Sequence, residues 1–271
     1  MVAATARLRA AGVPDPARDA RVLLAHAAQV DAARVTLIAP EDIAPDIADR
    51  YDHLIALRAV RVPVSHLIGA RAFYGRDFKI SAEVLDPRPE TETLIEAALA
   101  EKFDTVLDLG TGSGCLLVTL LAERKDAKGV GVDLSEAACL QASANAVLHG
   151  VAERAHIVEG DWFGPVDGRF DLIVSNPPYL SAFEMDDVAP ELRDHEPRMA
   201  LTDEGDGLSA YRIIAQTAGG FLTAQGRVLC EIGWQQGPGV RTIFADEGWG
   251  TVDILPDLDG RDRVVLARNP A

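Results

Sequence analysis

The residues best suited to chemistry in this sequence are Asn176, Pro177, Pro178 and Tyr179, which end an apolar run that starts at Phe170. The run is typical of a buried parallel strand, and neither proline can continue it. Because proline has no backbone N–H, the segment offers carbonyl acceptors, and the Asn176 side chain adds one acceptor and two donors. Such a stiff segment can hold a planar –NH2 group by both hydrogens, and Tyr179 offers a face for stacking. A plain turn that leaves a strand is the alternative.

A glycine-rich loop follows an earlier strand-like segment and reads Gly110-Thr111-Gly112-Ser113-Gly114. Glycines let the backbone pass close to a ligand, here at the N-terminus of a predicted helix. The spacing is Gly-x-Gly-x-Gly rather than the Gly-x-Gly-x-x-Gly of dinucleotide sites, and no Lys-Ser/Thr pair follows as in a P-loop. Alone the loop is a weak indication of a ligand site, because a tight strand–helix turn also explains it.

Acidic and aromatic residues close two later strands. Asp133 follows the loop by about 20 residues, where an acidic side chain can accept two ribose hydroxyls. Asp161 and Trp162 come after the next strand and would supply an acceptor and an aromatic wall beside an adenine ring. A surface aspartate after a strand is common, so each is weak evidence by itself. The carboxyl ends of parallel strands border one crevice, however, and together with Asn176 these residues predict one site.

The elements that must position these residues alternate regularly after Asp104. Seven strands joined by helical crossovers predict an α/β fold with a doubly wound sheet. The predicted strands are Thr105–Leu109, Gly129–Asp133, His156–Glu159, Asp171–Ser175, Arg227–Ile232, Thr251–Leu255 and Arg263–Ala267. The predicted helices are Cys115–Arg124, Glu136–His149, Leu208–Leu222 and Gln236–Glu247.

The first part of the chain has a different pattern. Apolar positions at helical spacing predict a helix that ends near Gly12, followed by helices over Ala17–Val30 and Ile47–Val60. We therefore expect a helical domain over residues 1–62 that recognises a partner; simple packing onto the main domain is the alternative. Residues 63–85 are predicted to form a β-hairpin linker from Val64–Ile68 and Phe78–Val84, and the main domain covers residues 86–271.

Composition excludes several classes of protein. The net charge of −16 opposes nonspecific binding to nucleic-acid phosphate. No apolar run approaches the ~18 residues of a membrane span, and the first residues lack the pattern of a signal peptide, so we expect a cytoplasmic protein without membrane partners. The cysteines and histidines show no metal-ligand spacing, and no metal is expected.

Together these segments resemble the HemK/PrmC family of class I S-adenosylmethionine-dependent methyltransferases, and the resemblance covers the whole chain. It rests on Phe73-Tyr74-Gly75, Pro87-Arg88-Pro89-Glu90-Thr91-Glu92, Leu107 through Cys115, Asn176 through Tyr179, Glu196-Pro197, Asp206-Gly207-Leu208 and Glu231-Ile232-Gly233-Trp234. That family methylates the glutamine of the Gly-Gly-Gln loop of class 1 peptide chain release factors. One departure is Asp86, where an aliphatic residue is usual before Pro-Arg-Pro-Glu-Thr; it bears on the packing of this loop.

The resemblance implies a Rossmann-like sheet of seven strands, with the helical domain and hairpin linker placed before it. It implies that S-adenosylmethionine is the cofactor and that a release factor is the protein partner. We further expect a monomer. The implied cofactor residues are Gly110, Thr111, Gly112, Ser113, Gly114, Asp133, Asp161, Trp162 and Asn176. The substrate glutamine would be held by Asn176, Pro177, Pro178 and Tyr179, of which Asn176, Pro177 and Tyr179 would be catalytic.

The chemistry of the tetrapeptide agrees with this implication. An amide nitrogen is a poor nucleophile, and it improves when its hydrogens are held by the Asn176 side-chain oxygen and the Pro177 carbonyl. Three alternatives stay open on sequence grounds. They are a glutamine methyltransferase of a ribosomal protein, an amino-methyltransferase of nucleic acid, and a module that binds the cofactor without catalysis.

Overall fold

The computed structural model describes residues 1–37 and 43–269. These residues form two compact units. Unit 1 contains the described part of residues 1–70 together with residues 189–195. Unit 2 contains residues 71–188 and the described residues from 196 onward. Within the described ranges, no helix is long and apolar enough to cross a membrane.

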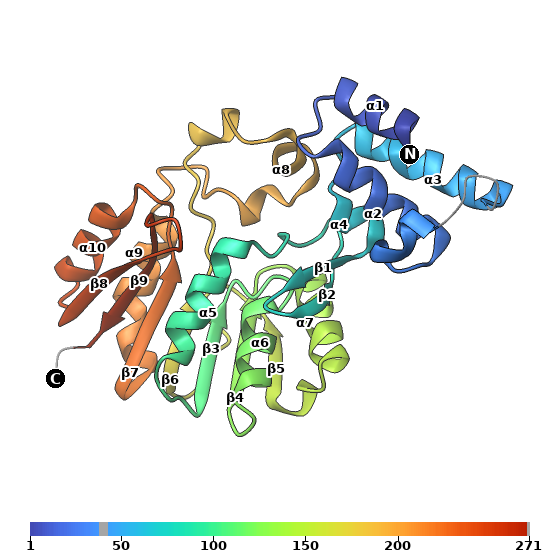
Figure 1. The fold of residues 1–271 in the computed structure, drawn as a ribbon. Helices are drawn as coiled ribbons and strands as arrows, with labels where there is room; N and C mark the ends of the chain where they lie inside the picture. The colour runs from blue at the N-terminus through green and yellow to red at the C-terminus, as the bar shows by residue number, and fades with distance from the viewer. Residues whose placement is uncertain (38–42, 270–271) are drawn as a thin grey trace. The chain divides into compact units, whose positions relative to one another are not determined.

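Unit 1 is helical, and its helices are drawn in blue to teal in Figure 1, with α8 in gold. Its elements are α1 (Val2–Ala10), α2 (Pro16–Ala28), η1 (Ala32–Leu37), α3 (Pro45–Ala59), α4 (Val64–Ile68) and α8 (Pro190–His195). Asp15 caps α2 by accepting the backbone N–H of Arg18, and Pro16 occupies the first turn, where its missing N–H costs nothing. Leu8, Leu23 and Ile55 form the centre of a separate apolar core.

The strand predicted at Val64–Ile68 was wrong, because this segment is helix α4. Pro63 begins the helix, and Gly69 ends it in the left-handed conformation at φ 70°. The β-hairpin comes later, as β1 (Ala70–Phe73) and β2 (Arg76–Lys79). Tyr74 and Gly75 form its turn with φ of 47° and 71°, the pair of positive values that two-residue hairpin turns favour.

Unit 2 is built on a seven-stranded sheet with the order β5-β4-β3-β6-β7-β9-β8. The strands are β3 (Thr105–Leu109), β4 (Lys128–Asp133), β5 (Ala155–Glu159), β6 (Phe170–Ser175), β7 (Leu222–Glu231), β8 (Thr251–Pro256) and β9 (Asp262–Arg268). Strands β3 to β7 pair in parallel, and β9 is antiparallel to both of its neighbours. The predicted doubly wound α/β sheet is therefore confirmed.

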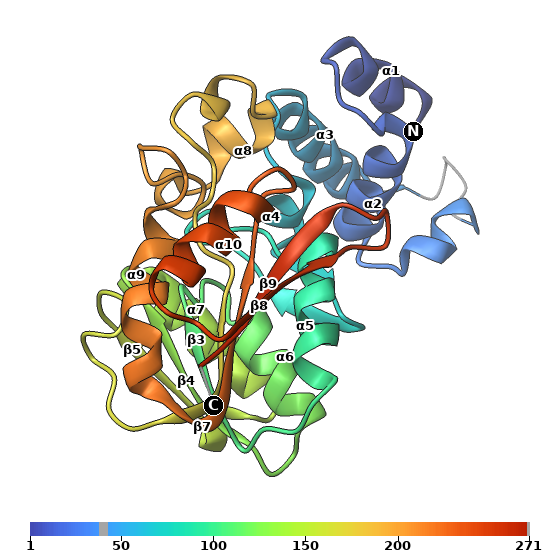
Figure 2. The same ribbon diagram turned by 90° about the vertical axis from the view of Figure 1, so that its left-hand side faces the viewer.

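Helices cover both faces of this sheet, because alternate strand residues bury apolar side chains on opposite sides. Leu172 and Val174 of β6 join the core under α5 (Glu92–Leu99), α6 (Cys115–Glu123) and α7 (Glu136–Leu148), whereas Ile173 joins the core under α9 (Ser209–Thr217) and α10 (Gly237–Asp246). Figure 2 shows α9 and α10 on one side of the strands and α5 and α6 on the other. The 3-10 turns of unit 2 are η3 (Pro89–Thr91), η4 (Ala152–Arg154), η5 (Glu184–Asp186), η6 (Arg198–Ala200) and η7 (Ala218–Phe221).

Candidate active site

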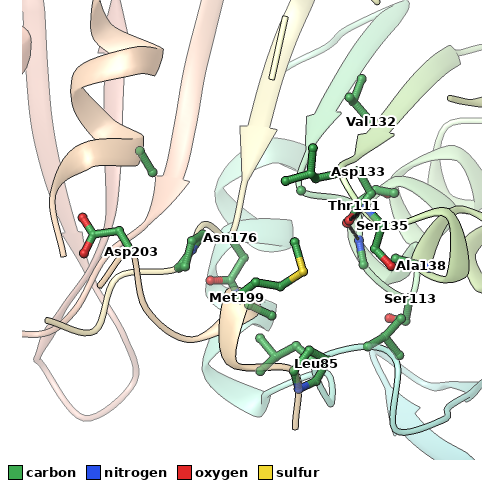
Figure 3. A pocket seen from close by; sticks show the side chains of 18 of the residues that line it. Leu85, Thr111, Ser113, Val132, Asp133, Ser135, Ala138, Asn176, Met199 and Asp203 are labelled. Atoms are coloured by element: carbon green, nitrogen blue, oxygen red, sulfur yellow. Dashed lines mark hydrogen bonds between the residues drawn. The ribbon is translucent and has the colours of Figure 1, made fainter. Parts of the chain in front are cut away.

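The carboxyl ends of β3, β4, β5 and β6 border a cavity of about 480 Å³. It lies where the strand order reverses, since β4 and β6 flank β3 on opposite sides, and this is the usual ligand position in such sheets. Figure 3 shows Asn176 on one side of the cavity and Asp133 and Ser135 on the other. The lining includes nine of the residues predicted from sequence, namely Gly110, Thr111, Gly112, Ser113, Asp133, Asp161, Trp162, Asn176 and Pro178.

The glycine loop needs its glycines for two different reasons. Gly110 and Gly112 have φ of 70° and 54°, and a Cβ built on either meets no atom within 4 Å, so the space beside them is open to a ligand. Gly114 also has positive φ, and its Cβ would lie 3.1 Å from the Cα of Ala142 on α7. Gly114 thus serves the close packing of α6 on α7 and does not line the cavity.

Asp133 joins the loops that follow the carboxyl ends of β3 and β4. Its Oδ2 accepts the backbone N–H of Gly112 at 2.8 Å, and its Oδ1 accepts that of Ser135 at 3.0 Å. Ser135 in turn caps α7 through its hydroxyl. Each carboxylate oxygen keeps a further lone pair, so Asp133 can still accept ligand hydroxyls.

Trp162 lines the cavity from a strained backbone position. Its φ of 48° is a rare value for a bulky residue and costs of order 1–3 kcal/mol. Two residues before Trp162, Gly160 cannot carry a side chain, because its Cβ would lie 2.4 Å from Cγ of Pro165. Part of the indole packs on the core beneath β5, while Asp161 stays exposed at the rim.

Asn176 begins the segment that leaves β6, and its side chain is fixed at one end only. Its Nδ2 donates to Thr91 Oγ1 at 3.2 Å. Its Oδ1 is shielded from solvent and has no hydrogen-bond partner among the described residues. A buried acceptor without a partner costs about 1–3 kcal/mol unless a ligand donor satisfies it. The hydroxyl of Ser175 donates to the Leu109 carbonyl at 2.7 Å and ties the end of β6 to that of β3.

Tyr179 and Pro177 do not line the cavity. The Tyr179 hydroxyl donates to Glu231 Oε1 at 3.3 Å, and burial raises its pKa. The Tyr179 carbonyl accepts from Gln236 Nε2 at 2.8 Å, and a Cβ on Gly207 would lie 2.3 Å from that carbonyl oxygen. The segment after β6 is therefore clamped by residues far along the chain.

Two buried carboxyl groups, those of Asp108 and Glu231, accept hydrogen bonds from residues that line the cavity. Burial raises the pKa of Asp108 to about 7, although hydrogen bonds from Thr111 and the Leu117 N–H lower it. Burial also raises the pKa of Glu231 to about 7, against hydrogen bonds from Thr91 and Tyr179 and the charge of Arg263. Neither acid was among the predicted site residues. The only available signal was their place in the motifs that carry the family resemblance.

The loop before α5 completes the lining. Arg88 Nη2 donates to both oxygens of Glu196, at 2.6 and 2.5 Å, and so joins the two segments that bring Pro87 and Pro197 to the cavity. Asp86, which directly precedes Pro87, is 4% exposed and lines the cavity. Burial and the Asp86 charge raise the pKa of Glu196, and Arg88 lowers it. Across the described residues, no group of His, Cys, Asp and Glu is arranged to hold a metal ion.

Comparison with known proteins gives matches that together extend over nearly the whole chain. Residues 1–69 match the family model for the PrmC N-terminal domain, and residues 80–208 match the methyltransferase small domain. The release factor glutamine methyltransferase of Cereibacter sphaeroides is 54% identical over 269 residues, which cover 99% of this chain and 97% of that protein. The protein of the same name from Agrobacterium fabrum is 39% identical, with 99% and 96% covered.

Solved structures share the fold at low sequence identity. A methyltransferase from Pyrococcus furiosus matches with a TM-score of 0.56 and 16% identity, covering 73% of this chain and 92% of that one. The hMettl16 catalytic domain matches with a TM-score of 0.61 and 17% identity, covering 79% and 80%.

Proposed function

Because the chain belongs to the family of release factor glutamine methyltransferases, we propose that it methylates the side-chain amide nitrogen of the glutamine in the Gly-Gly-Gln loop of class 1 release factors. The methyl donor in this proposal is S-adenosylmethionine. The observation that carries the substrate assignment is the buried Asn176 Oδ1, to which no donor among the described residues is hydrogen-bonded. A primary amide supplies the N–H that this oxygen lacks.

The residues around the cavity fit S-adenosylmethionine. Gly110 and Gly112 leave open space beside a backbone that a ligand can approach. Asp133 keeps lone pairs for ribose hydroxyls, and Asp161 and Trp162 offer an acceptor and an aromatic face for an adenine ring. We assign cofactor binding to Gly110, Thr111, Gly112, Ser113, Asp133, Asp161, Trp162 and Asn176, which line the cavity. Gly114, predicted from the sequence as a further cofactor residue, supports this loop through its packing on α7. When bound, this cofactor supplies an electrophilic methyl group on a sulfonium.

The substrate would be held by Asn176, Pro177, Pro178 and Tyr179. In this assignment Asn176 Oδ1 accepts one hydrogen of the glutamine –NH2, and the Pro177 carbonyl accepts the other. Both acceptors draw electron density toward nitrogen and fix its orientation, which lowers the barrier through alignment and placed dipoles. In the transfer, the glutamine nitrogen would form a bond to the methyl carbon, and the sulfur would leave with the electron pair of the broken carbon–sulfur bond. The alkylated amide is a strong acid and loses its proton to water, so no strong base is needed.

The test is transfer of labelled methyl groups to a purified class 1 release factor. The matched substrate is the same factor with the Gly-Gly-Gln glutamine replaced by alanine, and the matched enzyme is Asn176→Ala. Label should appear in the intact factor only, and mass spectrometry should place one methyl group on that glutamine. Label that enters a ribosomal protein or nucleic acid instead, in a whole extract, would reject the proposal.

A further inference from the structure

A chain of buried hydrogen bonds runs from the Asn176 amide to the end of β7. Asn176 Nδ2 donates to Thr91 Oγ1 at 3.2 Å, and the Thr91 hydroxyl donates to Glu231 Oε2 at 2.6 Å. The other oxygen of Glu231 accepts from the Tyr179 hydroxyl at 3.3 Å. Thr91 and Glu231 are each 1% exposed, so water does not compete for these bonds.

The direction of this chain follows from the number of protons available. An ionised carboxylate only accepts hydrogen bonds, so the single proton of the Thr91 hydroxyl must point to Glu231. The Thr91 oxygen can then only accept, and the partner it accepts from must be the –NH2 end of Asn176. An asparagine amide would otherwise be free to exchange its two ends, which have the same shape. Glu231 thus decides which end of Asn176 is left for a ligand.

We propose that Glu231 is a positioning residue, which acts through the Thr91 hydroxyl to keep the Asn176 side-chain oxygen turned toward the acceptor amide. This inference rests on the proposed function for the identity of that amide. Within residues 1–37 and 43–269, the Asn176 Oδ1 has no hydrogen-bond partner, as the proposal requires. Reversing the amide would present –NH2 to the –NH2 of glutamine, and two donors cannot bond each other.

The charge state of Glu231 links this arrangement to pH. Burial raises the pKa of Glu231 to about 7. Once protonated, the acid no longer requires the Thr91 proton, and the direction of the chain is lost. The titratable groups that influence Glu231, or that it influences, are Glu90 on η3, Cys115 on α6, Tyr179, Tyr211 on α9 and Arg263 on β9.

The test uses paired variants of the full chain. Thr91→Val removes the hydroxyl at nearly constant volume, and Thr91→Ser keeps it. Thr119→Val is the matched control, because Thr119 is also fully buried and its hydroxyl has no hydrogen-bond partner among the described residues. We expect Thr91→Val to lower kcat by about tenfold or more with cofactor Kd within about twofold, Thr91→Ser to restore most of kcat, and Thr119→Val to leave it unchanged.

The pH profile separates positioning from simple packing. The wild-type kcat should fall as pH drops below about 7, and Glu231→Gln, which cannot ionise, should flatten this limb. Equal activity of Thr91→Val and wild type, or equal losses in Thr91→Val and Thr91→Ser, would overturn the proposal. So would an unchanged pH profile in Glu231→Gln.

A readout without turnover keeps this inference separate from the proposed function. The side-chain –NH2 resonances of Asn176 can be assigned by their absence in Asn176→Ala. They should shift in Thr91→Val and not in Thr119→Val, whatever substrate the enzyme uses. If the release factor is not methylated but these resonances shift, the proposed function fails and the hydrogen-bond chain stands. Unshifted resonances alone reject the role of Thr91 and Glu231.

Discussion

The backbone N–H of Gly112 donates to Oδ2 of Asp133 across 2.8 Å, so the carboxylate at the end of β4 holds the glycine loop that follows β3. The same carboxylate binds the N–H of Ser135. Asp133 therefore combines two tasks: it orders the loop before any ligand arrives, and it leaves lone pairs for a ligand. Its replacement removes both contributions.

Asp133→Ala should weaken S-adenosylmethionine binding by roughly 1.5–3 kcal/mol, the scale of hydrogen bonds to a charged group. Isothermal calorimetry measures this directly. Asp167→Ala is the control, since Asp167 is exposed and does not line the cavity. Unchanged affinity in Asp133→Ala would show that the ribose is bound elsewhere.

Asn176→Ala should lower the methylation rate by about 100-fold or more, because it removes an acceptor that is placed for the reacting amide. The protein should stay folded and still bind cofactor, which circular dichroism and calorimetry can verify. Near wild-type turnover would exclude Asn176 from the mechanism.

Asp108 should make stability depend on pH. Burial raises its folded pKa to about 7, above the ordinary value of an unfolded aspartate. The free energy of unfolding therefore decreases as pH rises from about 4 to about 7, because Asp108 ionises more easily in the unfolded chain. Asp108→Asn removes this pH dependence, because an amide does not ionise. In urea unfolding, the difference in free energy of unfolding between Asp108→Asn and wild type should favour the variant more at about pH 8 than at about pH 5. The same pH dependence in both proteins would contradict the raised pKa of Asp108.

Glu191 on α8 should contribute to the stability of unit 1. It accepts from Arg58 at 2.9 Å and Arg61 at 2.5 Å, and the Arg58 side chain is only 6% exposed. Glu191→Ala should lower the free energy of unfolding by about 1–3 kcal/mol, because a buried guanidinium loses a partner. Asp194→Ala, whose ion pair with Arg193 is exposed, should change it little. Equal effects of the two substitutions would contradict this.

Recognition of the release factor should need unit 1, because one glutamine side chain offers too little surface for selection. A shortened chain beginning at Val64 should bind S-adenosylmethionine but methylate an intact release factor far more slowly. A free Gly-Gly-Gln peptide should be a poor substrate for both forms. Glu191→Ala in the full chain is the necessary control, because the deletion also removes Arg58 and Arg61 from α8. Full activity of the shortened chain would leave simple packing as the role of residues 1–62.

Sequence patterns predicted all seven strands. Strands β3 to β7 were recognisable because buried parallel strands are continuous apolar runs bounded by turn residues, and β8 and β9, which pair antiparallel, were predicted as well. The exception in length is β7, which begins at Leu222, five residues before the predicted start at Arg227. The cavity loops that begin at Gly110, Asp161 and Asn176 were predictable because each directly follows a strand, whereas the lining segments around Pro87 and Pro197 do not and were not predicted as part of the site. The link between Thr91 and Glu231 was not, because it joins residues 140 apart and depends on the fold. The domain boundaries at residues 62 and 85 stay predictions, and segment 189–195 had no signal that assigned it to unit 1.

The membership of residues 189–195 in unit 1 sets an order of events during synthesis. Domains usually fold as they emerge from the ribosome, starting at the N-terminus. Arg58 can pair with Asp19 at once, but its second partner, Glu191, is made 133 residues later. The helical unit therefore cannot be completed until most of the sheet has been translated. A nascent chain stalled before Glu191 would carry a helical unit that lacks its last helix. In that unit, Arg58 and Arg61 would lack the Glu191 carboxylate to which both donate in the complete chain.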